Sequence, residues 1–280
     1  MPRAWQVRQT YFDPQIEFVY PSRTLAVSST GADCSLNCAH CGGHYLKGMQ
    51  PLPPAVAQRQ ANIKSFLVSG GCDLKGTVPH LAKLNEIKEL AAHGTINLHT
   101  GLVTEEEAAV LGEVAAVVSF DLLLDGETIN DVYGLQASPR DFMESYRLLR
   151  KYTRVVPHLC LGLNRGVIGG EQNALQFLQE EGADAITFIV FLPTPGTAFA
   201  GCNPPPVAEV GDFLAMSRIM FPPIPLSLGC MRPGGKYRTA LDCIAIKAGI
   251  NKIVQPAPAA RLLAGELGLE IVKGEECCSL

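Results

Sequence analysis

Short apolar runs alternate with helical stretches along nearly the whole chain, and this alternation strongly limits the folds that the chain can adopt. Runs of apolar and β-branched residues between turn signals predict strands, and strands separated by helices predict βα units on a parallel sheet. The expected strands lie at 24–29, 64–69, 96–100, 115–120, 154–162, 185–191, 225–229 and 252–254. Eight such units predict an α/β fold of the (β/α)8 TIM-barrel type, closed or incomplete.

Signals at the helix ends support this pattern. Thr104 and Glu107 form a predicted capping box, and Ser138 can cap a helix that begins with Pro139. Other expected helices stop at glycines, namely Gly94, Gly182 and Gly249. In a barrel of this kind, functional side chains gather at the carboxyl ends of the strands.

One domain accounts for the whole chain. With 280 residues, of which 47% are hydrophobic, the chain can bury one large core. We expect an N-terminal extension over about 1–23, the barrel over about 24–265 and a C-terminal tail over about 266–280. No repeat or low-complexity tract suggests a second domain.

Charge and hydropathy patterns exclude two classes of protein. The formal net charge of −4 leaves no excess of positive charge for sequence-independent binding to nucleic acid. The first residues lack the apolar segment of a secretory signal, and no run approaches the roughly 20 apolar residues of a membrane span. These features predict a cytoplasmic protein without membrane partners.

Three of the ten cysteines, Cys34, Cys38 and Cys41, follow the first expected strand within eight residues. In a reducing compartment such thiols favour metal binding over disulfides. Three thiolates on one short loop can hold a cubane iron–sulfur cluster and leave one iron open. The alternatives are a zinc site completed by His40 or His44, and three unrelated buried thiols.

This C-x3-C-x2-C loop after the first strand of a barrel resembles the radical S-adenosylmethionine (SAM) superfamily. The resemblance implies a [4Fe–4S] cluster on Cys34, Cys38 and Cys41, whose open iron binds the amino and carboxylate groups of SAM. It further implies reductive cleavage of SAM to methionine and a 5′-deoxyadenosyl radical that removes a substrate hydrogen.

Other segments are similar to the SAM-binding elements of that superfamily. Ser69, Gly70 and Gly71 resemble the element whose backbone meets the SAM amino group, although Cys72 stands where the family often has an acidic residue. An ordinary βα turn would also explain the two glycines.

Two further strands carry candidate SAM ligands. Asp121 is the preferred candidate for the ribose hydroxyls and Asp125 the second, while a helix cap or a solvated acid is the alternative for either. The segment with His158 and Gly162 resembles the part that lies against adenine, and strand alternation would turn His158 towards the barrel interior. A satisfied core histidine is the alternative there.

From about residue 24 to 255 the chain resembles the biotin synthase branch, with one informative difference. Biotin synthase has a second cluster held by three cysteines and an arginine, and Cys230 stands here in the place of that arginine. A different auxiliary cluster is therefore conceivable, with its ligands drawn from Cys72, Cys230, Cys277 and Cys278; Cys202 is a weaker candidate.

The blocks 34–46 and 228–238 are most similar to the archaeal-type two-component lipoyl synthases, in particular to the second component. That resemblance implies a sulfurtransferase that inserts sulfur into an octanoyl chain on a carrier lysine of a lipoyl-domain or H-protein type. It also implies a paralogous radical SAM partner and a low-potential ferredoxin or flavodoxin. In that setting Arg232, Lys236, Tyr237 and Arg238 would meet the substrate or carrier, or simply form a solvated basic loop.

Two rival functions remain open on the sequence alone. One is a different biotin synthase-like radical SAM enzyme, such as a cofactor maturase or a mutase, which needs no sacrificial sulfur. The other is a non-enzymatic iron–sulfur or zinc scaffold.

Overall fold

A single curved sheet organises the protein, whose computed structural model describes residues 1–52 and 62–280. All pairings in this eleven-stranded sheet are parallel, and its order is β11-β1-β10-β9-β8-β7-β6-β5-β4-β2-β3. The strands are β1 (Gln15–Val19), β2 (Thr24–Ser28), β3 (Gln50–Pro51), β4 (Ser65–Ser69), β5 (Thr95–His99), β6 (Val117–Asp121), β7 (Val155–Leu161), β8 (Ile186–Val190), β9 (Leu226–Leu228), β10 (Lys252–Val254) and β11 (Glu270–Gly274).

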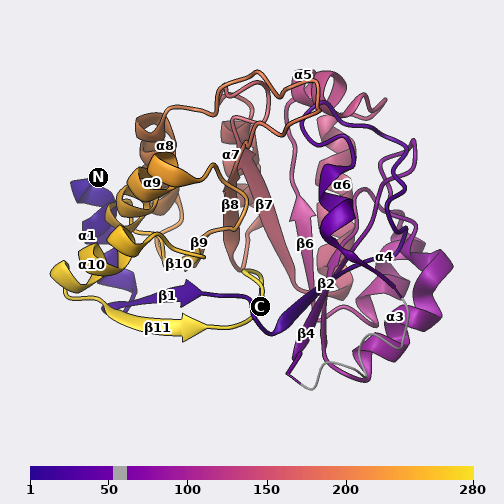
Figure 1. The fold of residues 1–280 in the computed structure, drawn as a ribbon, viewed down its shortest axis with the longest axis horizontal. Helices are drawn as coiled ribbons and strands as arrows, with labels where there is room; N and C mark the ends of the chain where they lie inside the picture. Colours follow the sequence, from indigo (N-terminus) through magenta and orange to yellow (C-terminus); the bar gives the residue numbers. More distant parts are fainter. Residues whose placement is uncertain (53–61) are drawn as a thin grey trace.

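Helices cover the outer side of this sheet (Figure 1). The α-helices are α1 (Pro2–Tyr11), α3 (Leu84–Ala91), α4 (Glu105–Gly112), α5 (Gly126–Thr128), α6 (Pro139–Tyr152), α7 (Glu171–Glu181), α8 (Val207–Met220), α9 (Gly235–Lys247) and α10 (Pro258–Glu266). Two 3-10 helices, η1 (His44–Gly48) and η2 (His80–Lys83), and a π-helical turn, η3 (Ile129–Tyr133), complete the described elements. None of the helices within the described residues combines the length and the apolar character needed to cross a membrane.

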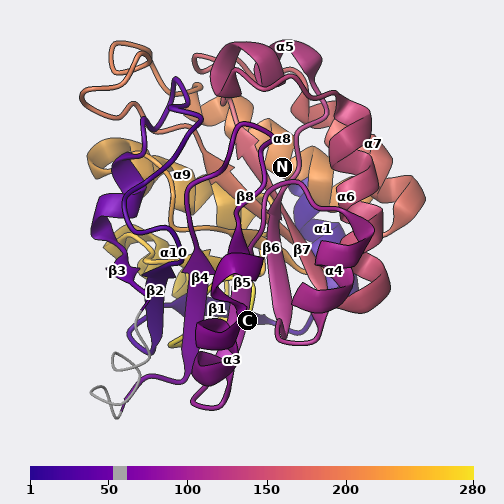
Figure 2. The same ribbon diagram turned by 90° about the vertical axis from the view of Figure 1, so that its right-hand side faces the viewer.

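The predicted barrel type is confirmed, and the barrel is incomplete. All eight expected strands are present as β2, β4, β5, β6, β7, β8, β9 and β10. The sheet curls without closing, since β11 and β3 form its two edges (Figure 2). Three strands were not expected. Strands β1 and β11 come from the terminal segments and extend the sheet beyond β10, and β3 pairs with β2 at the opposite edge.

The predicted helix ends are also present. Thr104 and Glu107 form the capping box of α4, with the Glu107 backbone N–H donating to Thr104 Oγ1 over 3.2 Å. Ser138 caps α6 ahead of Pro139 in a box that uses Asp141. Because these caps satisfy backbone N–H groups that have no partner inside the helix, they fix where each helix begins.

The buried core lies between the sheet and its helices, and includes Phe66, Phe120, Leu149 and Phe188. The concave face differs from that core because several of its inward side chains are polar. Asn97, Ser119 and His158 are buried at neighbouring positions of β5, β6 and β7. The sheet therefore surrounds an interior that is not filled by apolar side chains of its own strands.

Candidate functional site

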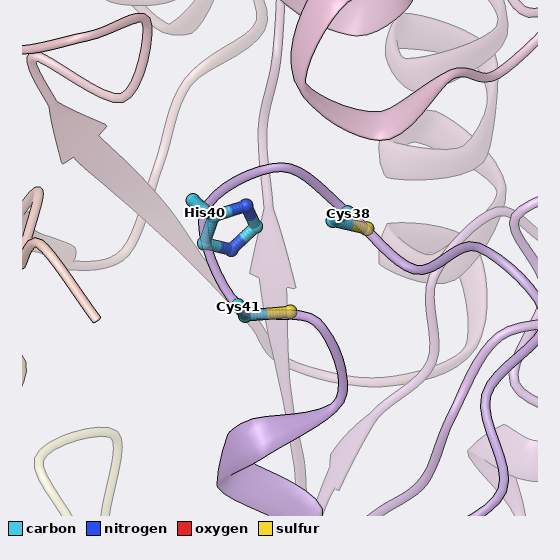
Figure 3. A group of neighbouring side chains, drawn as sticks. All are labelled: Cys38, His40 and Cys41. Atoms are coloured by element: carbon cyan, nitrogen blue, oxygen red, sulfur yellow. The ribbon is translucent and has the colours of Figure 1, made fainter. Parts of the chain in front are cut away.

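The cysteine loop follows β2 and lies at the carboxyl ends of the strands. Ligand atoms of Cys38, His40 and Cys41 all lie within 4.8 Å of one another, and Figure 3 shows their side chains around one bend of the loop. Cys34 stands outside this group, yet its backbone packs on Gly71 after β4, where an added Cβ would lie 2.5 Å from Cys34 Cα. The absence of a side chain at Gly71 is what lets the two loops approach.

Two thiols of this loop are electrostatically linked. The hydrogen bond with Cys38, aided by His40, lowers the pKa of the Cys41 thiol well below its ordinary value. The same hydrogen bond, together with burial, raises the pKa of the Cys38 thiol. A thiol that ionises easily beside a second thiol is a good starting point for metal binding, because metals bind the thiolate form.

His40 is part of this thiol group, whereas His44 is not. The His40 ring packs against Tyr133 with 5.4 Å between ring centroids. Its Nδ1 atom is buried and has no hydrogen-bond partner among the described residues. A buried nitrogen of this kind ordinarily has a partner, so it marks a place where a bound group fits.

A cavity of about 380 Å³ opens beside the loop, inside the curved sheet. His40 and Tyr45 line its edge next to the cysteines, and most of the remaining wall is apolar. The apolar wall is formed by Met49, Leu67, Leu122, Leu123, Leu124, Leu163, Ile189, Val190, Phe191, Leu192 and Met231. The cavity therefore suits a ligand with a large apolar part that reaches the thiol loop.

Four of the predicted SAM-binding residues line this cavity: Ser69, Asp121, Asp125 and His158. Asp125 serves as a helix cap, since its carboxylate accepts from the Thr128 backbone N–H over 2.9 Å. Asp121 is half exposed and its carboxylate lies 3.9 Å from His158 Nδ1. Of the two carboxylates, Asp121 is thus the one with oxygens available for hydroxyl groups.

The three predicted glycines lie behind the cavity and are not among the residues that line it. Gly70 packs on Ser29 and Gly71 on Cys34. Gly162 has a positive φ of 70° and packs on Pro205. Their contribution in this structure is to let segments pack closely behind the wall.

The sequence interpretation missed Glu171 at the start of α7, which also lines the cavity. Its carboxylate accepts backbone N–H groups of Gly162 and Gly169 over 2.6 and 2.7 Å. Burial raises the pKa of this carboxyl group. The signal in the sequence was an acid directly after two glycines at a helix start, a typical position for binding exposed N–H groups. Tyr133 and His99 of the same wall carried no recognisable signal.

Besides Cys160 on β7, three thiols reach the same cavity, namely those of Cys230, Cys277 and Cys278. Cys230 follows β9, whereas Cys277 and Cys278 come from the end of the chain. Cys277 Sγ lies 3.9 Å from Cys278 Sγ, and this contact lowers the pKa of Cys277 and raises that of Cys278. These three sulfurs do not form a group as compact as that of Cys38, His40 and Cys41.

The other candidate cysteines lie elsewhere. The Cys72 carbonyl accepts from the Ser35 backbone N–H over 2.8 Å, which places Cys72 beside the first thiol loop. Burial, followed by the neighbouring Cys34, raises the pKa of Cys72 to about 12. Cys202 packs in a separate apolar cluster around Phe199. Neither residue lines the cavity.

The predicted basic loop is partly structural. Arg232 is buried and donates to both carboxylate oxygens of Asp242, over 2.8 and 3.1 Å. Tyr237 donates its hydroxyl hydrogen to the Pro205 carbonyl over 2.6 Å. The expectation that Arg232 meets a substrate or carrier is therefore wrong: its guanidinium group is enclosed by its own chain and holds the loop after Cys230.

Comparison with known proteins agrees with this geometry. No protein-family profile matches the chain. A biotin synthase from Ruthia magnifica subsp. Calyptogena magnifica is 26% identical over 276 residues, which cover 90% of this chain and 80% of that protein.

Solved structures show the same fold. Methylornithine synthase has a TM-score of 0.69 with 14% identity, over 96% of this chain and 87% of that one. The FeFe-hydrogenase maturase HydG from Carboxydothermus hydrogenoformans has a TM-score of 0.64 with 15% identity, over 90% of this chain and 61% of that one. Streptococcus suis SuiB bound to S-adenosylmethionine has a TM-score of 0.53 with 15% identity, over 81% of this chain and 52% of that one.

The open parallel barrel with a three-cysteine loop at its mouth is thus similar in fold to these structures and, in its cysteine pattern, to the radical SAM superfamily. This chain is similar in sequence to a biotin synthase and in fold to methylornithine synthase and HydG. Its cofactors are a [4Fe–4S] cluster and S-adenosylmethionine. The residues fit them, because ligand atoms of Cys38, His40 and Cys41 lie within 4.8 Å of one another, and His40 lines the same cavity as Asp121 and His158.

Proposed function

We propose that this radical SAM enzyme is a lipoyl synthase that inserts sulfur into an octanoyl chain carried on a protein lysine. In each insertion a C–H bond of the chain would be broken, with its hydrogen passing to the 5′-deoxyadenosyl radical derived from SAM. A C–S bond would form in its place, with an auxiliary cluster as the source of the sulfur and the acceptor of the remaining electron. The single observation that supports this proposal best is the presence of Cys230, Cys277 and Cys278 in the same apolar cavity that adjoins the first thiol loop.

The first thiol loop has the role of binding the cluster. Cys34, Cys38 and Cys41 would hold a [4Fe–4S] cluster, which when bound would supply the electron for reductive cleavage of SAM. His40, Tyr133 and Tyr45 enclose the adjoining side of the cavity and keep water away from it. Tyr45 is itself held by a 2.7 Å hydrogen bond between its hydroxyl group and Thr194 Oγ1.

The apolar wall has the role of binding the chain. An octanoyl group offers no hydrogen bonds along its length, so it gains most from a wall of leucine, isoleucine and phenylalanine side chains. Asp121 and His158 occupy the polar part of the cavity, where the hydroxyl groups and ring nitrogens of SAM would find partners. The two ligands thus use different parts of one space.

The additional thiols have the role of holding a sulfur source, an auxiliary [4Fe–4S] cluster. Among the four cysteines considered for it, Cys230, Cys277 and Cys278 lie on the cavity, while Cys72 lies beside the first loop. A paralogous radical SAM protein, an octanoylated lipoyl-domain or H-protein-type carrier, and a low-potential ferredoxin or flavodoxin complete the proposed reaction.

Metal content and product formation test this proposal. We expect about eight irons per chain after anaerobic reconstitution, and about four in a Cys34/Cys38/Cys41→Ala variant. With the partner protein, carrier and reductant present, mass spectrometry should find sulfur on the octanoyl chain. About four irons falling to none, and no thiolated product, would overturn the proposal.

A second candidate is a radical SAM mutase or maturase without sulfur insertion. The similarity to methylornithine synthase over nearly the whole chain favours this alternative. It requires the first cluster alone, so an iron count of about four with intact SAM cleavage would support it.

A further inference from the structure

The concave face of the sheet carries polar side chains halfway along its strands. Asn97 on β5 and Ser119 on β6 are at most 1% exposed, and His158 on β7 is 6% exposed. The interior of a barrel of this type is ordinarily packed with bulky branched side chains. Buried polar groups need hydrogen-bond partners, so this layer requires an occupant.

The occupant is the end of the chain itself. Ser279 Oγ lies 2.8 Å from Ser119 Oγ and 3.1 Å from His158 Nε2, while Asn97 Nδ2 donates to Cys277 Sγ over 3.3 Å. Ser119 also donates to Asn97 Oδ1 over 3.0 Å, which links the contacts into one network. Each of these three side chains thereby has a hydrogen-bond partner, whereas the hydroxyl group of Thr187, beside His158 on β8, has none among the described residues.

The backbone of the same segment is held as well. Arg154 Nη1 donates to the Ser279 carbonyl over 3.1 Å, and Lys252 Nζ lies 3.5 Å from the carbonyl oxygens of Cys278 and Leu280. The Leu280 side chain packs on an apolar patch at the starts of the strands, which consists of Val117, Val156 and Ala185. Polar contacts and an apolar anchor therefore act on four consecutive residues.

This arrangement positions two thiols. Because Ser279 and Leu280 are fixed below them, Cys277 and Cys278 are turned into the cavity that they share with Cys230. Figure 1 shows the end of the chain between the two arms of the curved sheet. A polar tail in solution would keep neither thiol at a defined place.

We propose that residues 277–280 form a plug that closes the floor of the cavity, in which Ser279 and Leu280 are positioning residues for the thiols of Cys277 and Cys278. The inference rests on the proposed function for the use made of these thiols. The plug itself depends only on contacts within the chain, so the two can fail separately.

Thiol alkylation in cluster-free protein tests the plug directly. Iodoacetamide is added to the reduced, folded protein at one pH, and mass spectrometry follows modification of each cysteine, with Cys243 on α9 as internal reference. We expect Cys277 and Cys278 to react about ten to a hundred times faster in Ser279→Ala than in the wild type, because a buried hydrogen-bond pair is lost and the segment opens more often.

Two further variants keep the test decisive. Leu280→Asp removes the apolar anchor and should give the same acceleration. Ser22→Ala, at an exposed serine, is the matched control and should react like the wild type. Equal rates at Cys277 in the wild type, Ser279→Ala and Leu280→Asp would overturn the plug.

Iron content separates the plug from the proposed function. After reconstitution, Ser279→Ala should keep the irons of the first thiol loop and lose those that depend on Cys277 and Cys278. If alkylation confirms the plug while the wild type holds only about four irons, the proposal of sulfur insertion is wrong. The proposal that the plug positions the thiols is then still supported.

Discussion

The mouth and the floor of the barrel are organised in opposite ways. At the mouth, the thiols of Cys38 and Cys41 lie on a loop, and the neighbouring His40 nitrogen has no partner among the described residues. On the floor, Ser279 is hydrogen-bonded to Ser119 and His158, and each side chain of this network makes at least one hydrogen bond. The comparison teaches that the His40 nitrogen at the mouth needs a bound group as its partner. On the floor, residues of the chain itself are the partners of the buried polar side chains.

Removing a thiol at the mouth should have the largest effect and should leave the floor unchanged. In Cys38→Ala the cluster that we propose for the thiol loop would lose one of its three ligands, so we expect reductive SAM cleavage to fall below detection. Formation of 5′-deoxyadenosine measures this loss. Alkylation of Cys277 should stay as slow as in the wild type; faster alkylation would show that the two regions are not independent.

Breaking the buried ion pair behind the cavity should destabilise the whole protein. Asp242→Ala leaves the Arg232 guanidinium buried without its carboxylate, which we expect to cost about 3–5 kcal/mol. Equilibrium unfolding in urea measures the difference in the free energy of unfolding. Glu113→Gln, in an exposed pair with Lys88, is the control and should change little. A comparable loss in both variants would contradict a special role for the buried pair.

Filling the gap at Gly71 should damage the mouth alone. The added Cβ of Gly71→Ala would lie 2.0 Å from the Asp33 carbonyl oxygen, so the loop with Cys34 must shift. Strain of this kind costs about 1–3 kcal/mol, which corresponds to a loss of cluster retention of about fivefold to 160-fold. Iron release to a chelator measures this effect. Gly48→Ala, where nothing lies within 4 Å of the added atom, should retain iron normally.

Lowering the pH should reduce the free energy of unfolding, because His80 and His158 are buried in their neutral form. Burial lowers the pKa of His80 to about 4, and His80 Nε2 lies 2.8 Å from the His99 carbonyl oxygen. Burial also lowers the pKa of His158. Since the unfolded chain then binds more protons than the native one, stability is fully present above about pH 6.5 and falls as the pH drops towards 4.

Between these pH values, the free energy of unfolding should fall by at most about 1.4 kcal/mol per pH unit for each histidine. Urea unfolding between pH 7 and pH 4.5 measures it. His80→Gln should flatten the curve relative to the wild type, and His93→Gln, at an exposed site, should not. An unchanged curve in His80→Gln would show that this histidine is not buried in its neutral form.

Local patterns were sufficient to predict much of this molecule. Short stretches of sequence predict the eight strands and the caps at Thr104 and Ser138, and the structure confirms them. Strand alternation also predicted that His158 faces the interior, where it lines the cavity. The edge strand β11 was missed because its side chains are mostly exposed and show no alternation.

The floor was not predictable from local patterns for a different reason. Ser279 lies in a polar stretch that looks like a solvated tail, and its partners are 121 and 160 residues away in the sequence. Likewise, nothing near Arg232 indicated that it would be buried by Asp242. Contacts of this kind depend on the completed sheet, which brings the partners together.

The sequence separation of the floor contacts bears on the order in which the protein assembles. Neighbouring strands such as β6 and β7 pair across one helical crossover, in which the partners Val118 and Val155 are 37 residues apart, whereas Asn97 meets Cys277 across 180 residues. Long loops close at a greater entropic cost and their contacts form late in folding. We therefore expect Cys277 and Cys278 to remain accessible to iron and sulfide while the sheet forms, and to be enclosed in the last step of folding.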